Sequence, residues 1–204
     1  MIVGIDPSLT STGVVVLDDA GGFLGAAQVP SGPGEALHVR LRAIAESVEN
    51  VIWQSRDGRW LGAAGFSDGP PPIPLYVFVE EPGGALKGAA QDCRTLFWFI
   101  AEQLCREDEG WETSLHSIAP ATLTKFITGR GNATAQDKCA AVMARWMHLL
   151  PEEFHVSPEQ KGGVARCKDL FDGLALAQAG LVYLTGEGTV AQKATLAGKV
   201  KKIT

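Results

Sequence analysis

Four acidic residues stand at positions where the sequence pattern suggests a shared chemical role. Asp6 and Glu80 each close a short apolar run, and Asp169 and Asp172 lie three residues apart in an apolar stretch. Carboxylates that gather in one place repel one another unless a cation lies between them, and Mg²⁺ prefers oxygen ligands. Two such ions about 3.5–4 Å apart can activate a water and stabilise the leaving oxygen of a phosphodiester. The four acids therefore indicate metal-dependent phosphodiester hydrolysis.

The predicted elements around these acids can bring them together. Asp6 ends a strand over 2–6, and Glu80 ends a strand over 75–79. If these strands are parallel neighbours, both carboxylates emerge at the same edge of the sheet. Asp169 and Asp172 share one face of a helix over 168–184, because positions i and i+3 are neighbours on a helix surface. The rest of that helix is almost wholly apolar, so we expect it to pack against the sheet.

Each acid also has a simpler interpretation. Asp6 precedes Pro7 and could be a turn residue, and Glu80 could be a loop acid. Asp169 could be a charge that the helix dipole favours near an N-terminus. Asp172 is harder to explain in this way, because it interrupts an apolar helix. The metal-site hypothesis rests on the combination of the four.

The pattern along the whole chain predicts an α/β fold. The expected order is β-β-β-α-β-α-β-α with a final helix, which indicates a mixed five-stranded sheet flanked by helices. Three antiparallel strands come first and two parallel strands follow. The expected strands cover 2–6, 13–19, 23–29, 75–79 and 114–118, and the expected helices cover 35–56, 88–106, 121–127, 134–149 and 168–184.

Length and composition limit the class of protein. A chain of 204 residues with 46% hydrophobic and 20% charged residues is long enough to bury one core. No run of about 18 apolar residues is present, and the start, MIVGIDPSLT, is not a signal peptide. We therefore expect no membrane association and a cytoplasmic location. We expect a nuclease domain over 1–185 with an exposed loop insertion at 57–74, and a loosely packed basic tail over 186–204.

The distribution of charge favours a nucleic-acid partner in spite of the net charge of −5. After residue 113, 11 Lys and Arg stand against 7 Asp and Glu. Lys125, Arg130 and Lys138 flank the Gly-rich turn GRGNAT, whose backbone N–H groups can hold phosphate together with the N-terminus of the helix that follows. Thr134 or Asn132 can cap that helix.

The alternative is an ordinary turn with solvated side chains. Lys87 and Arg94, which follow Glu80, could likewise contact the DNA backbone or belong to a solvated helix face. The residues that we expect to contact DNA are Lys87, Arg94, Lys125, Arg130, Asn132 and Lys138.

Four segments of the chain resemble the motifs of the RuvC family of Holliday-junction resolvases, within the RNase H-like superfamily. They are GIDPSLTSTGVVV (4–16), YVFVEEP (76–82), APATLTKFITGRGNA (119–133) and KDLFDGLALAQA (168–179). In this resemblance Glu80 takes the position of the catalytic glutamate. A lysine that the family carries near the start of the helix after the third segment is displaced here. Ala135 stands there, and Lys138 follows one turn later on a similar face.

The resemblance implies that the mixed five-stranded sheet has the RNase H-like fold. It also implies a homodimeric endonuclease that depends on Mg²⁺ or Mn²⁺ and cuts two strands of a four-way DNA junction. Asp6, Glu80, Asp169 and Asp172 would be the catalytic residues and would coordinate two ions in each active site. A two-fold dimer suits a junction with two related scissile phosphates. Short divergent members of this kind are typical of bacteriophages, which would place the protein in the host cytoplasm.

Two other functions remain open from the sequence. One is a related RNase H-like nuclease that acts on RNA or an RNA–DNA hybrid. The other is a non-catalytic protein that binds branched DNA on the same fold.

Overall fold

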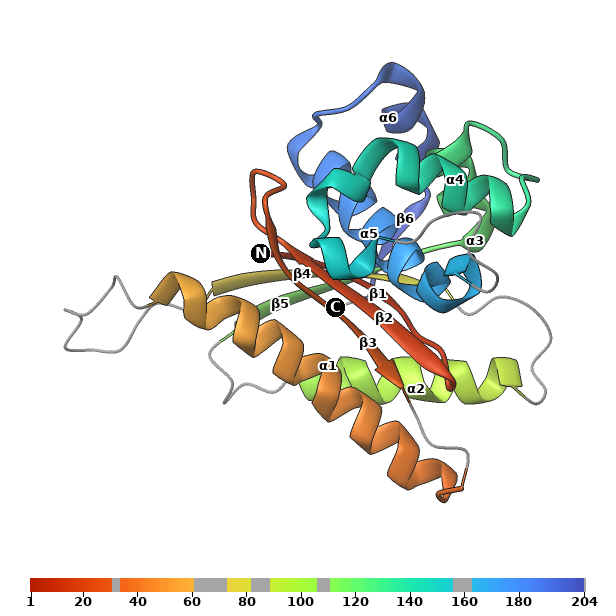
Figure 1. The fold of residues 1–204 in the computed structure, drawn as a ribbon. Coiled ribbons are helices and arrows are strands. Elements are labelled where there is room, and N and C mark those ends of the chain that lie inside the picture. Colours follow the sequence, from red (N-terminus) through yellow and green to blue (C-terminus); the bar gives the residue numbers. More distant parts are fainter. Residues whose placement is uncertain (31–33, 61–72, 82–88, 106–110, 156–162, 204) are drawn as a thin grey trace.

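The computed structural model describes residues 1–30, 34–60, 73–81, 89–105, 111–155 and 163–203, which form a mixed sheet between two layers of helices (Figure 1). The strands are β1 (Ile2–Asp6), β2 (Ser11–Leu17), β3 (Phe23–Pro30), β4 (Ile73–Glu80), β5 (Trp111–Ile118) and β6 (Val200–Lys202). The helices are α1 (Leu37–Trp60), α2 (Ala89–Leu104), α3 (Pro120–Thr128), α4 (Ala135–Trp146), α5 (Gly163–Thr185) and α6 (Val190–Leu196), with 3₁₀ turns at Met147–Leu149 and Glu152–Phe154.

The sheet has the predicted mixed topology. Its strand order is β3-β2-β1-β4-β5-β6. β1 and β2 pair antiparallel, as do β2 and β3, whereas β1, β4 and β5 run parallel. The α/β class and the three-antiparallel-then-parallel arrangement are therefore confirmed. None of the described helices is long and apolar enough to cross a membrane.

The C-terminal segment differs from its expectation. Residues after 186 do not form a loose arm: α6 buries Leu196, and β6 pairs antiparallel with β5, so the sheet has six strands where five were predicted. Thr189 and Gln192 form a capping box that starts α6. The basic composition predicted exposed side chains, and Lys201 and Lys202 are indeed exposed. An edge strand rich in lysine pairs its backbone with the sheet and keeps its charged side chains exposed. Composition indicates the exposed charges but not the backbone pairing.

The predicted insertion at 57–74 is shorter in the structure. α1 continues through Trp60 and β4 begins at Ile73, so the helical and strand patterns both extend into the expected loop. Residues 61–72 lie outside the described part of the chain.

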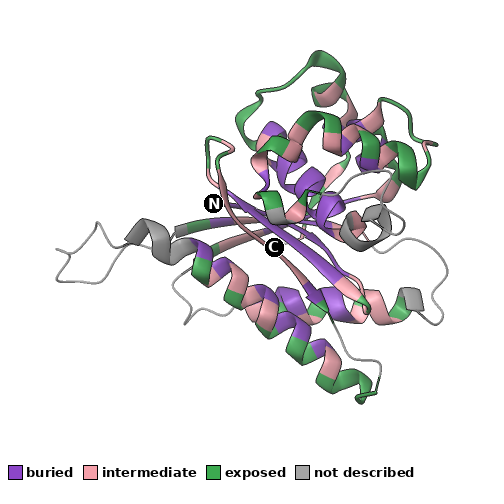
Figure 2. Cartoon of the chain, viewed as in Figure 1, coloured by how far each residue is buried: buried purple, intermediate pink, exposed green. Residues whose placement is uncertain are grey.

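The helices bury both faces of the sheet (Figure 2). α1 and α2 cover one face, and α5, with α3, α4 and α6 outside it, covers the other (Figure 1). Strands buried on both faces read as continuous apolar runs, which is the pattern of β1, β2 and β4. One apolar layer therefore lies on each face of the sheet, and α5 packs in one of these layers.

Glycines bring the backbone of α5 into direct contact with β1 and β2. A Cβ atom at Gly4 would lie 2.0 Å from the carbonyl oxygen of Gly173, and one at Gly13 would lie 1.9 Å from that of Asp169. Glycine inside a strand often marks such a close approach of two backbones. Because α5 carries two of the predicted acids, this packing fixes their distance from the ends of the strands.

Two buried rings, Phe78 and His116, and the exposed Tyr183 form an aromatic group on the α5 side of β4 and β5. The ring of His116 stacks on Phe78 with centroids 4.8 Å apart, and Tyr183 contacts it edge-on at 5.6 Å. Nδ1 of His116 is buried and has no hydrogen-bond partner within the described part of the chain. Burial, and then the nearby Lys202, lower the pKa of His116 from its ordinary value of 6.5.

The lowered pKa of His116 predicts that the protein loses stability in acid. The native state binds fewer protons than the unfolded state below pH 6.5, so the free energy of unfolding falls as the pH drops through that value. His116→Phe keeps the stacking and removes the proton site. Between pH 7.5 and 5.5, the free energy of unfolding measured with urea should fall by up to about 1.4 kcal/mol more in the wild type than in the variant. An equal loss in both proteins would contradict this role.

Candidate active site

Three of the predicted acids converge at the carboxyl edge of the sheet. Asp6 ends β1, Glu80 ends the neighbouring parallel strand β4, and Asp172 reaches them from α5. One carboxylate oxygen from each residue lies within 4.8 Å of the other two. The side chains of Asp6 and Asp172 are almost fully buried, with 9% and 3% of each residue exposed. The arrangement follows directly from the parallel pairing of two strands that both end on an acid.

The electrostatics of these acids favour a bound cation. Burial raises the pKa of Asp6 well above its ordinary value, and the charges of Glu80 and Asp172 raise it further. Burial, followed by Asp172, also raises the pKa of Glu80. Removing several carboxylates from water is costly unless opposite charge lies between them. An all-oxygen donor set with this spacing fits a hard divalent ion such as Mg²⁺ or Mn²⁺.

Asp169 lies beside this group and is not one of the three that converge. Its carboxylate oxygen is 3.7 Å from Nζ of Lys168, and the side chain of Ser11 acts to lower its pKa. Burial raises its pKa, while Lys168 and Ser11 oppose that effect. The predicted fourth ligand thus sits at the margin of the site with partners of its own.

Two lysines contact the most buried acid. Nζ of Lys138 lies 2.9 and 3.1 Å from the two oxygens of Asp172, and Nζ of Lys168 lies 3.2 Å from one of them. Burial disfavours the charge on Lys168, but the acids, Asp172 foremost, outweigh it and raise the pKa of this lysine. Lys138 was predicted to contact DNA, and in the structure its ammonium belongs to the acidic site.

The turn before α4 explains how Lys138 is held. Thr134 caps α4, accepting a hydrogen bond from the Asp137 amide while the Asp137 carboxylate accepts one from the Thr134 amide. This capping box fixes the first turn of the helix, and Lys138 follows immediately. Of the two predicted caps, Thr134 takes the role.

The other residues predicted to contact DNA lie on the surface. Lys125, Arg130 and Asn132 are exposed on α3 and the turn after it, and Arg94 is exposed on α2. Arg130 makes a long ion pair of 3.9 Å with Asp137. Lys87 lies outside the described residues. These side chains are accessible to a phosphate backbone, as the prediction requires.

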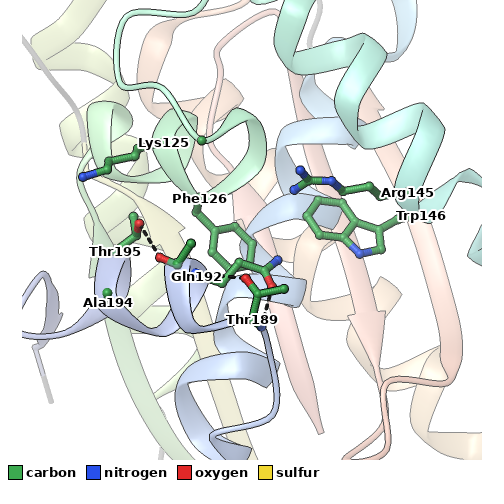
Figure 3. A pocket seen from close by; sticks show the side chains of 10 residues that line it. Lys125, Phe126, Arg145, Trp146, Thr189, Gln192, Ala194 and Thr195 are labelled. Atoms are coloured by element: carbon green, nitrogen blue, oxygen red, sulfur yellow. Dashed lines mark hydrogen bonds between the residues drawn. The ribbon is translucent and has the colours of Figure 1, made fainter.

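Two basic hollows flank these residues. One, of about 600 Å³, lies between α3, α4 and α6; Lys125 and Arg145 line it, and the ring of Trp146 stacks on Phe126 (Figure 3). Its described lining residues include no acid. The other hollow, of about 460 Å³, joins Arg94 and the exposed Trp98 of α2 to the lysines of β6. Glu81 also lines it and pairs with Lys201 at 3.0 Å. Positive charge therefore lies over helices on both faces of the sheet.

Lys168 and Ser11 were not among the residues predicted from the sequence. The contact of Lys168 with the acids could have been predicted from the sequence, because Lys168 stands four residues before Asp172 on the same helix and immediately before Asp169. The contact of Ser11 with Asp169 had none, because it depends on how closely α5 approaches β2.

The sheet order, the helices on both faces and the acids at the ends of β1 and β4 and on α5 define an RNase H-like fold. Among solved structures, the Thermus thermophilus RuvC structure aligns with a TM-score of 0.57 and 19% identity over 100% of both chains. T. thermophilus RuvC in complex with Holliday junction substrate aligns with a TM-score of 0.58 and 18% identity over 98% of both. The chain therefore has the RuvC fold, as its motifs implied. No protein-family model matches it, and no curated protein sequence does so.

Proposed function

We propose that the protein is a metal-dependent, structure-selective DNA endonuclease that resolves four-way junctions. The observation that carries this proposal is the convergence of Asp6, Glu80 and Asp172 within 4.8 Å at the edge of the sheet. The fold supports it, because one structure with the same fold is RuvC bound to a Holliday junction substrate. Branched DNA is therefore the substrate class that we assign.

In this proposal the acids of the site bind the metal, and a lysine positions one of them. Asp6, Glu80 and Asp172 would hold Mg²⁺ or Mn²⁺, with Asp169 as an outer carboxylate. A bound divalent ion supplies a water of lowered pKa and polarises the phosphodiester. Lys138 contacts both oxygens of Asp172, which holds this carboxylate in a fixed orientation. The tight packing of α5 excludes bulk water from behind the acids.

The basic surface would hold the arms of the junction. Exposed cations neutralise phosphates without reading sequence, and Arg94, Lys125 and Arg130 lie on three different segments of the surface. Lys87 and Asn132 complete the DNA-binding set that we propose. A homodimer would present two such sites to the two related strands of the junction.

The test is cleavage of a synthetic four-way junction by the purified protein with Mg²⁺. We expect paired nicks at symmetric positions, no nicks with EDTA, and little cleavage of a linear duplex of the same sequence. Parallel digestion of an RNA–DNA hybrid and structured RNA separates the related nuclease function. Preferred cleavage of hybrid would overturn the junction assignment, and tight junction binding without cleavage in Mg²⁺ or Mn²⁺ would indicate a non-catalytic binding protein.

A further inference from the structure

The hollow between α3, α4 and α6 has no part in the proposed metal site. Arg145, one of its lining residues, follows Lys138 by seven residues on α4, which is about 10 Å along a helix. Lys138 contacts Asp172, so the hollow lies toward the other end of α4 from the acids. Its volume of about 600 Å³ is within the range of pockets that hold a ligand.

The polar side chains that α6 contributes to the hollow already have partners. Oγ1 of Thr189 accepts a hydrogen bond from the Gln192 amide, and the Gln192 side chain accepts one from the Thr189 amide. The Thr195 hydroxyl donates to the carbonyl oxygen of Ala191 (Figure 3). This wall therefore offers a ligand mainly the surface of small side chains, Ala191 and Ala194.

Lys125 and Arg145 supply the charge of the hollow. Both are exposed, and they lie on opposite sides of Phe126 (Figure 3). Among the described lining residues no acid offsets them. A guanidinium can bind a carboxylate through two parallel hydrogen bonds, and the lysine adds a second positive charge. The hollow therefore favours an anionic ligand.

The wall between the two cations is aromatic. The ring of Trp146 stacks on Phe126 with centroids 5.9 Å apart and an interplanar angle of 16°. Cζ of Arg145 lies 6.0 Å from the centroid of the Trp146 ring, in a cation–π contact. These contacts hold the indole and the guanidinium in place before a ligand binds, which lowers the entropy cost of binding. The wall thus presents an ordered apolar surface beside fixed positive charge.

We propose that this hollow binds a peptide segment of a partner protein that carries acidic residues beside a bulky apolar residue. The carboxylates pair with Lys125 and Arg145, and the apolar side chain contacts Trp146 and the small residues of α6. The combination favours a peptide over DNA, because a phosphate backbone supplies negative charge but no apolar side chain. Grooves between helices commonly bind peptides through such apolar anchors.

The test is selection of a phage-displayed library of random short peptides on the purified protein. It is carried out without DNA, because Lys125 also belongs to the proposed DNA-binding set. We expect the enriched peptides to combine Asp or Glu with Leu, Ile, Phe or Trp. A fluorescein-labelled synthetic copy of an enriched peptide then gives the dissociation constant by fluorescence anisotropy. Copies with the acids changed to their amides, or with the apolar residue changed to Ser, should bind at least about tenfold more weakly.

Two variants of the protein test the charge and the shape of the hollow separately. Arg145→Glu should weaken binding of the enriched peptide at least about tenfold, because like charges then face each other. Ala194→Trp fills the hollow without changing its charge and should weaken binding to a similar extent. Lys193→Glu and Ala144→Trp make the same changes at exposed positions outside the described lining, and should bind as the wild type does. Thermal unfolding checks that each variant is folded.

The proposal is overturned if no acidic and apolar peptide is enriched, or if Arg145→Glu and Ala194→Trp bind the enriched peptide as tightly as the wild type. It is equally overturned if Arg145→Glu weakens junction binding and lowers its salt dependence by about one phosphate contact, because the hollow would then hold a DNA arm. The nuclease proposal is judged separately, by junction cleavage with Mg²⁺, which Arg145→Glu should leave unchanged.

Discussion

Asp6→Asn is expected to abolish junction cleavage and, in the absence of metal, to raise the melting temperature of the protein. The carboxylate of Asp6 is buried beside Glu80 and Asp172, and its pKa lies well above the ordinary value of 3.8. Its charge therefore destabilises the metal-free fold at neutral pH. An amide of the same shape removes that charge and the ion ligand together, so function and stability should change in opposite directions.

The sign of the pH dependence follows from the raised pKa. The native state binds more protons than the unfolded state at pH values above 3.8, so the metal-free wild type loses stability as the pH rises from 3.8 through the raised pKa. Asp6→Asn lacks this loss. Each unit of difference is worth about 1.4 kcal/mol, and about 1 kcal/mol shifts the melting temperature of a domain of this size by about 2–4 °C.

The measurement is thermal unfolding at pH 7 with EDTA and with Mg²⁺, alongside cleavage of a four-way junction. Metal should stabilise the wild type by mass action and leave Asp6→Asn nearly unchanged. Cleavage should fall by more than about 100-fold, because changing a residue that only supports a metal ligand already costs about 10–100-fold. Glu187→Gln, an exposed acid before α6, is the matched control and should behave as the wild type. A lower melting temperature of Asp6→Asn in EDTA would contradict the electrostatic interpretation.

The convergence of Asp6 and Glu80 could be predicted from the sequence, because two apolar strands that end on acids need only pair in parallel to bring them together. Asp172 could be predicted because an acid inside an apolar helix needs a buried partner. Asp169 shares that helix face, but the three-residue spacing cannot decide between the ion group and a nearby lysine. That choice depends on side-chain rotamers and on Ser11, which lies more than 150 residues earlier in the chain.

The sixth strand illustrates a different limit. β6 has three residues, two of them lysine, and nothing in its periodicity separates an edge strand from a solvated tail. Its register against His116, Ser117 and Ile118 arises from the open edge of β5, which is a property of the assembled sheet. Lys138 could be predicted in part. Its helix face was predicted from the sequence, but its contact with Asp172 depends on the packing of α4 on α5.

Gly13→Ala is expected to damage the site without altering any acid. The added Cβ would lie 1.9 Å from the backbone oxygen of Asp169 and 2.6 Å from the backbone nitrogen of Leu170. Neither atom can move without the helix, so α5 must shift away from β2. Overpacking of this kind typically costs about 1–3 kcal/mol and occasionally more, and contacts with backbone atoms place this change at the upper end.

The functional effect of Gly13→Ala should exceed what the loss of stability explains. A shift of α5 moves Asp172 relative to Asp6 and Glu80, and a misplacement of about 1 Å can cost about 100-fold in rate. We expect urea unfolding to show the destabilisation, junction cleavage to fall at temperatures where the variant is folded, and the Mg²⁺-induced rise in melting temperature to shrink. Gly34→Ala makes the same chemical change where no atom of the described residues meets the added Cβ within 4 Å, and should be neutral in all three measurements. Wild-type cleavage and metal response in folded Gly13→Ala would show that the site tolerates movement of α5, and that the close backbone contact serves stability alone.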